Sequence, residues 1–199
     1  MSLARNRLTE ERKNWKANHP VGFWAKPMKA EDGSMNLLEW ECGIPGKAAV
    51  SYLCFLRSVL LFSSLSLSNR PRLLFLPLCP LLFFPLLFPS QTAWEGGTYR
   101  LVMSFTEDFP ATPPTCKFDP PIFHPNVFPS GKVCLSILNE DKDWVPTITI
   151  KDVLRGIQDL LNNPNLADPA QREAHVMCKD DLPKYLARVR ELAKKYNSK

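Results

Sequence analysis

Residues 123–138 read FHPNVFPSGKVCLSIL, and they place Asn126 and Cys134 eight residues apart across a loop that proline and Gly131 punctuate. Proline fixes φ and glycine admits turn conformations, so we expect the loop to hold both side chains in place. Cysteine is well suited to carry an acyl group as a thioester, because its sulfur is a strong nucleophile and leaves readily. An asparagine amide does not titrate, and such a donor to an oxyanion is worth about 10²–10³ in rate. The stretch predicts a nucleophile, Cys134, with an oxyanion donor, Asn126.

The alternatives for these side chains are weaker. A free cysteine is usually a buried structural thiol, but Asn126 and the loop around Cys134 favour a nucleophile. His124, ten residues before Cys134, suggests a cysteine–histidine protease dyad, although no base-orienting motif of that class accompanies it. A zinc site at His124 and Cys134 lacks two further ligands at suitable spacing.

The same run, from Phe123 to Leu138, resembles the active-site signature of the ubiquitin-conjugating enzymes, and in detail it is similar to the SUMO-conjugating enzymes among them. The resemblance covers everything outside residues 50–91. It implies that Cys134 accepts SUMO from an activating enzyme by transthiolation and that Asn126 stabilises the oxyanion when a substrate lysine attacks. A ubiquitin-carrying relative and a catalytically impaired binding module of the same fold are the alternatives.

The resemblance also implies roles for further residues. Asp168 matches the acidic residue that positions the incoming lysine, and His124 matches a structural residue that fixes the loop. The substrate groove is implied to include Phe128, Ser130, Pro169, Ala170 and Gln171. Non-covalent SUMO binding and docking of the activating enzyme are implied for Arg12, Lys13, Lys16 and His19, although a solvated basic helix face is the simpler interpretation of such a charge run.

The chain departs from the family pattern at four positions, all implied to lie in or near the substrate groove. Phe128 stands where tyrosine is usual, Thr115 where lysine is usual, Lys132 where threonine is usual and His175 where tyrosine is usual. These changes put the preferred substrate motif in doubt and leave the thioester chemistry intact. The segment Asn139–Trp144 and the long hairpin around Asp32-Gly33 resemble the SUMO-conjugating enzymes in particular.

The hydrophobic pattern predicts an α+β domain with a four-stranded antiparallel sheet. Residues 98–105 alternate, with Tyr99, Leu101, Met103 and Phe105 on the face that should meet the core. Asp168 followed by Pro169 is a typical helix start, so Asp168 is also a candidate N-cap. We expect helices over 3–17, 149–162, 168–177 and 181–196, and strands over 21–27, 35–44, 98–105 and 115–118.

Composition fits one domain of 199 residues with a net charge of +5. No long basic block is present, so we expect acidic protein partners rather than nucleic acid. The six cysteines form no CxxC pair, which suits a reducing compartment, and residues 1–20 lack the apolar run of a signal peptide. The family resemblance implies the nucleus and cytoplasm as location, no cofactor or metal, and SUMO, its activating enzyme, SUMO ligases and lysine-bearing substrate proteins as partners.

Residues 50–91 differ from the rest of the chain. Arg57, Arg70 and Arg72 are their only charges, and residues 73–90 consist of Phe, Leu, Ser and Pro apart from Cys79. A membrane anchor is disfavoured, because the prolines recur too often for an unbroken helix. All-pyrimidine codons encode those four residue types, and Val50-Ser51 can be encoded by GTAAGT, as at a splice donor. We therefore hypothesise an in-frame retained intron that interrupts a single catalytic domain spanning residues 1–199, and sequencing of mature transcripts tests this.

Overall fold

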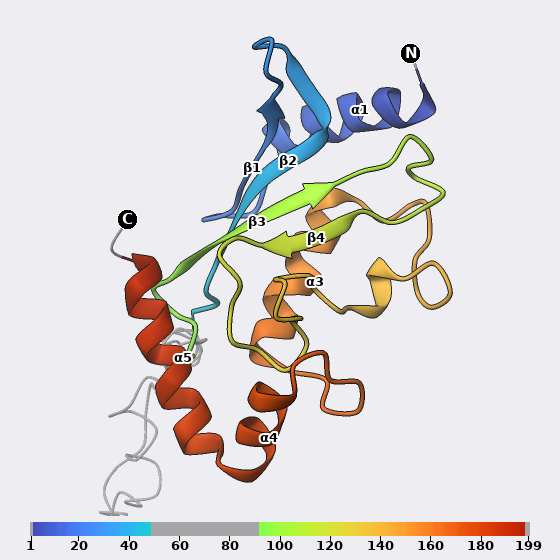
Figure 1. The fold of residues 1–199 in the computed structure, drawn as a ribbon. Coiled ribbons are helices and arrows are strands. Elements are labelled where there is room, and N and C mark those ends of the chain that lie inside the picture. The colour runs from blue at the N-terminus through green and yellow to red at the C-terminus, as the bar shows by residue number, and fades with distance from the viewer. Residues whose placement is uncertain (1, 49–91, 198–199) are drawn as a thin grey trace, which may run out of the picture. The chain divides into compact units, whose positions relative to one another are not determined.

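The computed structural model describes residues 2–48 and 92–197 (Figure 1). Within these two ranges, one α-helix precedes the sheet and three α-helices follow it, which confirms the predicted α+β class with an antiparallel sheet. The elements are α1 (Leu3–Ala17), β1 (Trp24–Lys29), β2 (Met35–Pro45), β3 (Thr98–Ser104), β4 (Thr115–Phe118), the short 3-10 helix η4 (Ser136–Leu138), α3 (Ile150–Asn162), α4 (Arg172–Asp180) and α5 (Leu182–Asn197).

The four strands follow one another in the order β1-β2-β3-β4, and each pairs antiparallel with the next. The first turn uses Gly33 at φ +80°, as the Asp32-Gly33 signal predicts. The first strand begins at Trp24 and not at residue 21, because Gly22 has φ +82° and the Phe23 N–H donates to the carbonyl of Pro20. A turn therefore precedes the strand, which a run of apolar residues does not reveal.

The core lies between the sheet and the helices. Tyr99, Leu101 and Met103 on β3 are fully buried, which confirms the inward face predicted from alternation. The helix α3 buries a stripe along its length and begins with a capping box in which Thr149 and Asp152 bond each other's backbone. That stripe consists of Ile150, Val153, Leu154, Ile157, Leu160 and Leu161.

A buried carboxylate joins α1 to α3. Glu11 is 5% exposed and pairs with Arg7 at 2.8 Å, one turn earlier on α1. Its second oxygen accepts the backbone N–H of Ile150 at 3.2 Å, and this is one of the N–H groups that have no partner within α3. Arg7 also donates to the carbonyls of Pro146 and Ile148. Glu11 therefore fixes both the entry to α3 and the position of α1.

Helix α4 begins later than the sequence suggests. The N-cap is Gln171 and the first helical residue is Arg172, so the prediction of a helix starting at Asp168 with Asp168 as its N-cap is wrong. The backbone N–H groups of Ala170 and Gln171 both donate to the carbonyl of Pro125, at 2.8 and 3.0 Å. These tertiary bonds hold the segment against the 124–126 loop, and the helix starts only after them.

The described residues on the two sides of 49–91 meet in one antiparallel pair. Pro45 at the end of β2 pairs with Thr98 at the start of β3, and the Gly46 N–H donates to the Gly97 carbonyl at 2.8 Å. Residues 1–47 and 93–199 group into one unit. The hypotheses about residues 50–91 lie outside the described residues. Among the helices that are described, none is long and apolar enough to cross a membrane.

Candidate active site

The loop that carries Asn126 and Cys134 folds back on itself. The Cys134 N–H donates to the carbonyl of Asn126 at 2.9 Å, and Val127 pairs with Val133 in an antiparallel bridge. Gly131 turns the loop at φ +88°, and a Cβ there would lie 2.4 Å from the carbonyl oxygen of Phe118. Backbone hydrogen bonds and a turn that requires glycine thus place Asn126 and Cys134 opposite each other.

His124 supports this loop from inside the protein. It is fully buried, and its Nδ1 accepts the backbone N–H of Asn126 at 3.0 Å. Burial lowers the pKa of His124 from 6.5 to about 4, against the opposing effect of the Leu160 and Leu161 backbone. The imidazole is therefore neutral at pH 7 and keeps the lone pair that the loop needs. This geometry disfavours a protease-like dyad, because Nδ1 is bonded to the backbone and the ring does not line the groove around Cys134.

The Asn126 side chain is 1% exposed and binds the loop that precedes α4. Its Oδ1 accepts the N–H of Asn165 at 2.8 Å, and its Nδ2 donates to the carbonyls of Asn165 and Asp168 at 2.7 and 3.1 Å. Both amide hydrogens are thus in use. Donation to an oxyanion at Cys134 requires that one of these two bonds be exchanged.

A second set of bonds reinforces this attachment. The Gln171 side-chain oxygen accepts the N–H of His124 at 3.2 Å, beside the two bonds to the Pro125 carbonyl. The segment 165–171, some 40 residues along the chain, is therefore held against residues 124–126 at several points. As a result, the Asp168 side chain stands at the edge of the groove that contains Cys134.

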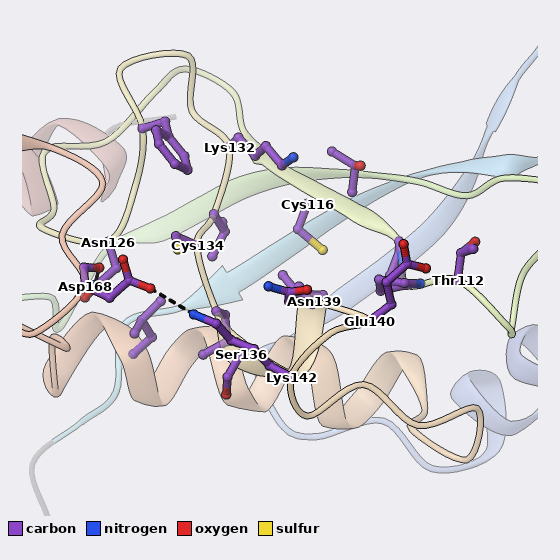
Figure 2. Close-up of a pocket in the computed structure, with 18 of the residues that line it drawn as sticks. Thr112, Cys116, Asn126, Lys132, Cys134, Ser136, Asn139, Glu140, Lys142 and Asp168 are labelled. Atoms are coloured by element: carbon purple, nitrogen blue, oxygen red, sulfur yellow. Dashed lines mark hydrogen bonds and ion pairs between the residues drawn. The ribbon is translucent and has the colours of Figure 1, made fainter.

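The groove has a volume of about 680 Å³ and is drawn in Figure 2. Cys134, a free thiol of intermediate exposure, lies in it with Asn126 and Asp168 near one end, and Thr112 and Glu140 stand at the other. Of the residues predicted for substrate binding, Phe128 lines the groove and is 40% exposed. Phe128 is one of the four positions that depart from the family, and two others, Thr115 and Lys132, also line the groove.

The remaining predicted groove residues have other surroundings. Pro169 is exposed, and the Ser130 hydroxyl accepts the N–H of Lys132 at 3.5 Å. Ala170 and Gln171 take part in the backbone attachment to Pro125, and an imidazole nitrogen of His175 lies 3.1 Å from the carbonyl oxygen of Leu166. None of these side chains lines the groove, so their contact with substrate stays a prediction.

The sequence reasoning missed Lys142. Its Nζ lies 3.0 Å from Asp168 Oδ2 across the groove, as the dashed line in Figure 2 shows. The hydrogen bond to Asp168 raises the pKa of Lys142, and the charges of Asp168 and of a Cys134 thiolate act in the same direction. A lysine between the acidic residues of segment 139–144 reads as an ordinary solvated charge, so the sequence offered no signal for this pair.

The basic residues of the N-terminal region lie apart from the groove. On α1, Lys13 and Lys16 are exposed and Arg12 is half-buried, whereas Leu8 and Trp15 on the same helix are buried in the core. Lys13 pairs with Glu10 at 2.8 Å, and the His19 ring stacks on Trp15 with 5.8 Å between centroids. None of the four predicted docking residues lines the groove. Their role in docking is a prediction about a separate surface.

Comparisons with known proteins identify the family of the chain. A family model described as ubiquitin-conjugating enzyme matches residues 82–193. The chain is 46% identical to the SUMO-conjugating enzyme UBC9 of Caenorhabditis elegans over 98% of this chain and 92% of the relative. It is 45% identical to the SUMO-conjugating enzyme SCE1 of Arabidopsis thaliana, over 98% and 95%, and 48% identical to a Dictyostelium discoideum SUMO-conjugating enzyme, over 83% and 78%. The chain therefore belongs to the ubiquitin-conjugating enzyme family.

Proposed function

We propose that this protein is a SUMO-conjugating enzyme, a transferase that carries SUMO as a thioester on Cys134. The observation that carries the proposal is the free, partly exposed Cys134 in a groove bounded by Asn126 and Asp168. The names of the three relatives support SUMO as the modifier.

The reaction has two acyl transfers. In the first, the Cys134 thiolate attacks the thioester carbonyl that joins SUMO to its activating enzyme, so that a new C–S bond forms and the activating enzyme's thiolate leaves. In the second, the amine of a substrate lysine attacks the carbonyl on Cys134. A C–N bond forms, the nitrogen loses one proton to water, and the C–S bond breaks so that Cys134 leaves as a thiolate.

The second transfer needs a neutral lysine. With a reference pKa near 10.4, only about one lysine in 2,500 is neutral at pH 7. The Asp168 carboxylate by itself would raise the acceptor's pKa, so we assign it the task of orienting the amine toward the carbonyl. Desolvation in the groove supplies the opposite shift. Asn126 serves the same step in two ways, by holding the segment that carries Asp168 and by donating to the oxyanion.

The proposed partners are SUMO, its activating enzyme, SUMO ligases and proteins with acceptor lysines, and the proposed location is the nucleus and cytoplasm. We assign the docking of SUMO and the activating enzyme to the basic face of α1, which includes Arg12, Lys13 and Lys16, and to His19. Replacing those four residues by alanine should slow thioester formation and leave discharge of a preformed thioester unchanged, because the groove contains none of them.

A charging assay tests the proposal. The protein is incubated with SUMO, its activating enzyme and ATP, and a reductant-sensitive band should appear on a gel. The Cys134→Ser variant should instead trap a reductant-resistant ester, since serine forms an oxygen ester at the same position. Parallel reactions with ubiquitin and its own activating enzyme identify the modifier. If only ubiquitin is loaded, the modifier is wrong; if Cys134→Ser still modifies substrates, the nucleophile is wrong.

A further inference from the structure

The Lys142–Asp168 ion pair occupies the place where the proposed mechanism puts the substrate's amine. Lys142 Nζ bonds Asp168 Oδ2 at 3.0 Å, and both residues line the groove that contains Cys134. Figure 2 shows the pair beside Cys134, with the lysine approaching from the loop after η4. An acceptor lysine would present the same chemical group, an ammonium on a flexible stem, to the same carboxylate.

Lys142 is a competitor for Asp168 and not an acceptor itself. Its bond to Asp168 raises its pKa, so at neutral pH it stays protonated and lacks the lone pair that aminolysis needs. It is tethered to the chain, so it returns to Asp168 whenever the carboxylate is free. An incoming lysine that makes no other contact must displace it on charge alone.

We infer that Lys142 is an intrinsic gate on the acceptor site: it holds the Asp168 carboxylate in the resting enzyme and must be displaced before a substrate lysine is oriented. This inference rests on the proposed function. The gate favours lysines that bring further contacts with the groove over free amines, because only the former gain enough binding to release Lys142. It therefore adds a residue that determines acceptor specificity.

The gate is weak. The two side chains are 51% and 57% exposed, and ion pairs in water at such positions shift equilibria by only about two- to five-fold. A weak pair suits the task, since a tight one would also exclude the proper substrate. We expect Lys142→Gln to lower the free-lysine concentration for half-maximal discharge by about two- to five-fold, with the limiting rate unchanged.

The test measures discharge of preformed thioester against increasing free lysine. Lys142→Arg keeps the charge and should behave as the wild type. Lys26→Gln is the charge-matched control, because Lys26 pairs with Glu41 on the sheet and does not line the groove. Hydroxylamine, which is uncharged at neutral pH, should discharge all four proteins at the same rate. A Lys142→Gln protein that discharges more slowly to lysine, or faster to both nucleophiles, overturns the inference.

A second measurement is independent of the modifier. Methylammonium is titrated into the enzyme that carries no modifier on Cys134, while the carboxyl ¹³C resonance of Asp168 is followed by NMR. Saturation at a lower methylammonium concentration in Lys142→Gln than in wild type and Lys26→Gln supports the gate, and identical curves refute it. If wild-type protein fails to load SUMO, the proposed function fails, whereas this titration still decides the role of Lys142.

Discussion

The Asn126→Ala substitution separates the two roles assigned to this side chain. Alanine removes three hydrogen bonds, two to Asn165 and one to the Asp168 carbonyl, at a position that is 1% exposed. Each net bond is worth about 0.5–1.5 kcal/mol, so the segment 165–168 should lose about 2–4 kcal/mol of local stability. The Asp168 carboxylate would then lose its fixed position beside Cys134.

Native-state hydrogen exchange measures this loss directly. In the wild type the Asn165 N–H donates to Asn126 Oδ1, so in Asn126→Ala its exchange should speed up by about 30- to 1,000-fold, the equivalent of 2–4 kcal/mol. The N–H groups of Ala170 and Gln171 donate to the Pro125 carbonyl and not to Asn126. They are internal controls, and their exchange should change less.

A double-mutant cycle with Asp168→Ala then assigns the catalytic effect. If Asn126 acts by holding Asp168, its removal should slow lysine discharge less in the Asp168→Ala background than in wild type, because the two residues share one function. A pure oxyanion donor would give the same loss, about 10²–10³-fold, in both backgrounds. The proposal that Asn126 acts by holding the segment 165–168 would be refuted by two results together: an unchanged exchange rate of the Asn165 N–H, and an equal decrease in the rate of lysine discharge in both backgrounds.

Three further predictions concern stability and folding. Between pH 6.5 and about 4, His124 is protonated in the unfolded chain but not in the folded protein. The free energy of unfolding should therefore decrease by up to about 3 kcal/mol as the pH is lowered through that window. Urea unfolding at several pH values measures this dependence, and His124→Asn should weaken it. Glu11→Ala removes the carboxylate partner of Arg7 and the acceptor of the Ile150 N–H. It should therefore lower the free energy of unfolding in urea by about 2–4 kcal/mol, whereas the exposed Glu10→Ala should lower it by less than about 1 kcal/mol. Deleting residues 50–91 should leave a protein that still folds and loads SUMO on Cys134, since Pro45 and Thr98 are already paired; loss of cooperative thermal unfolding would contradict this.

Local patterns in the sequence predicted most of the elements. The bounds of α1 and β4 agree with the predicted ranges 3–17 and 115–118, and α3 begins one residue after its predicted start. These elements depend on helical and strand periodicity, on caps and on turn residues. Because such signals involve residues only a few positions apart, they can be predicted from the sequence. The predicted starts of β1 and α4 were wrong. Gly22, with its positive φ, delays the start of β1, and the hydrogen bonds of Ala170 and Gln171 to the Pro125 carbonyl delay the start of α4.

From the sequence by itself came the family and the prediction of its chemistry: a cysteine eight residues after an asparagine, in a loop of proline and glycine, indicates the ubiquitin-conjugating enzymes and predicts Cys134 as the reactive sulfur. Only the tertiary structure decided what surrounds that sulfur. The Asn126 amide bonds residues 39 and 42 positions away, and Lys142 meets Asp168 across 26 positions. Such contacts depend on how the folded backbone brings distant segments together. They cannot be predicted from periodicity or spacing along the chain, because these patterns describe only residues that are close in sequence.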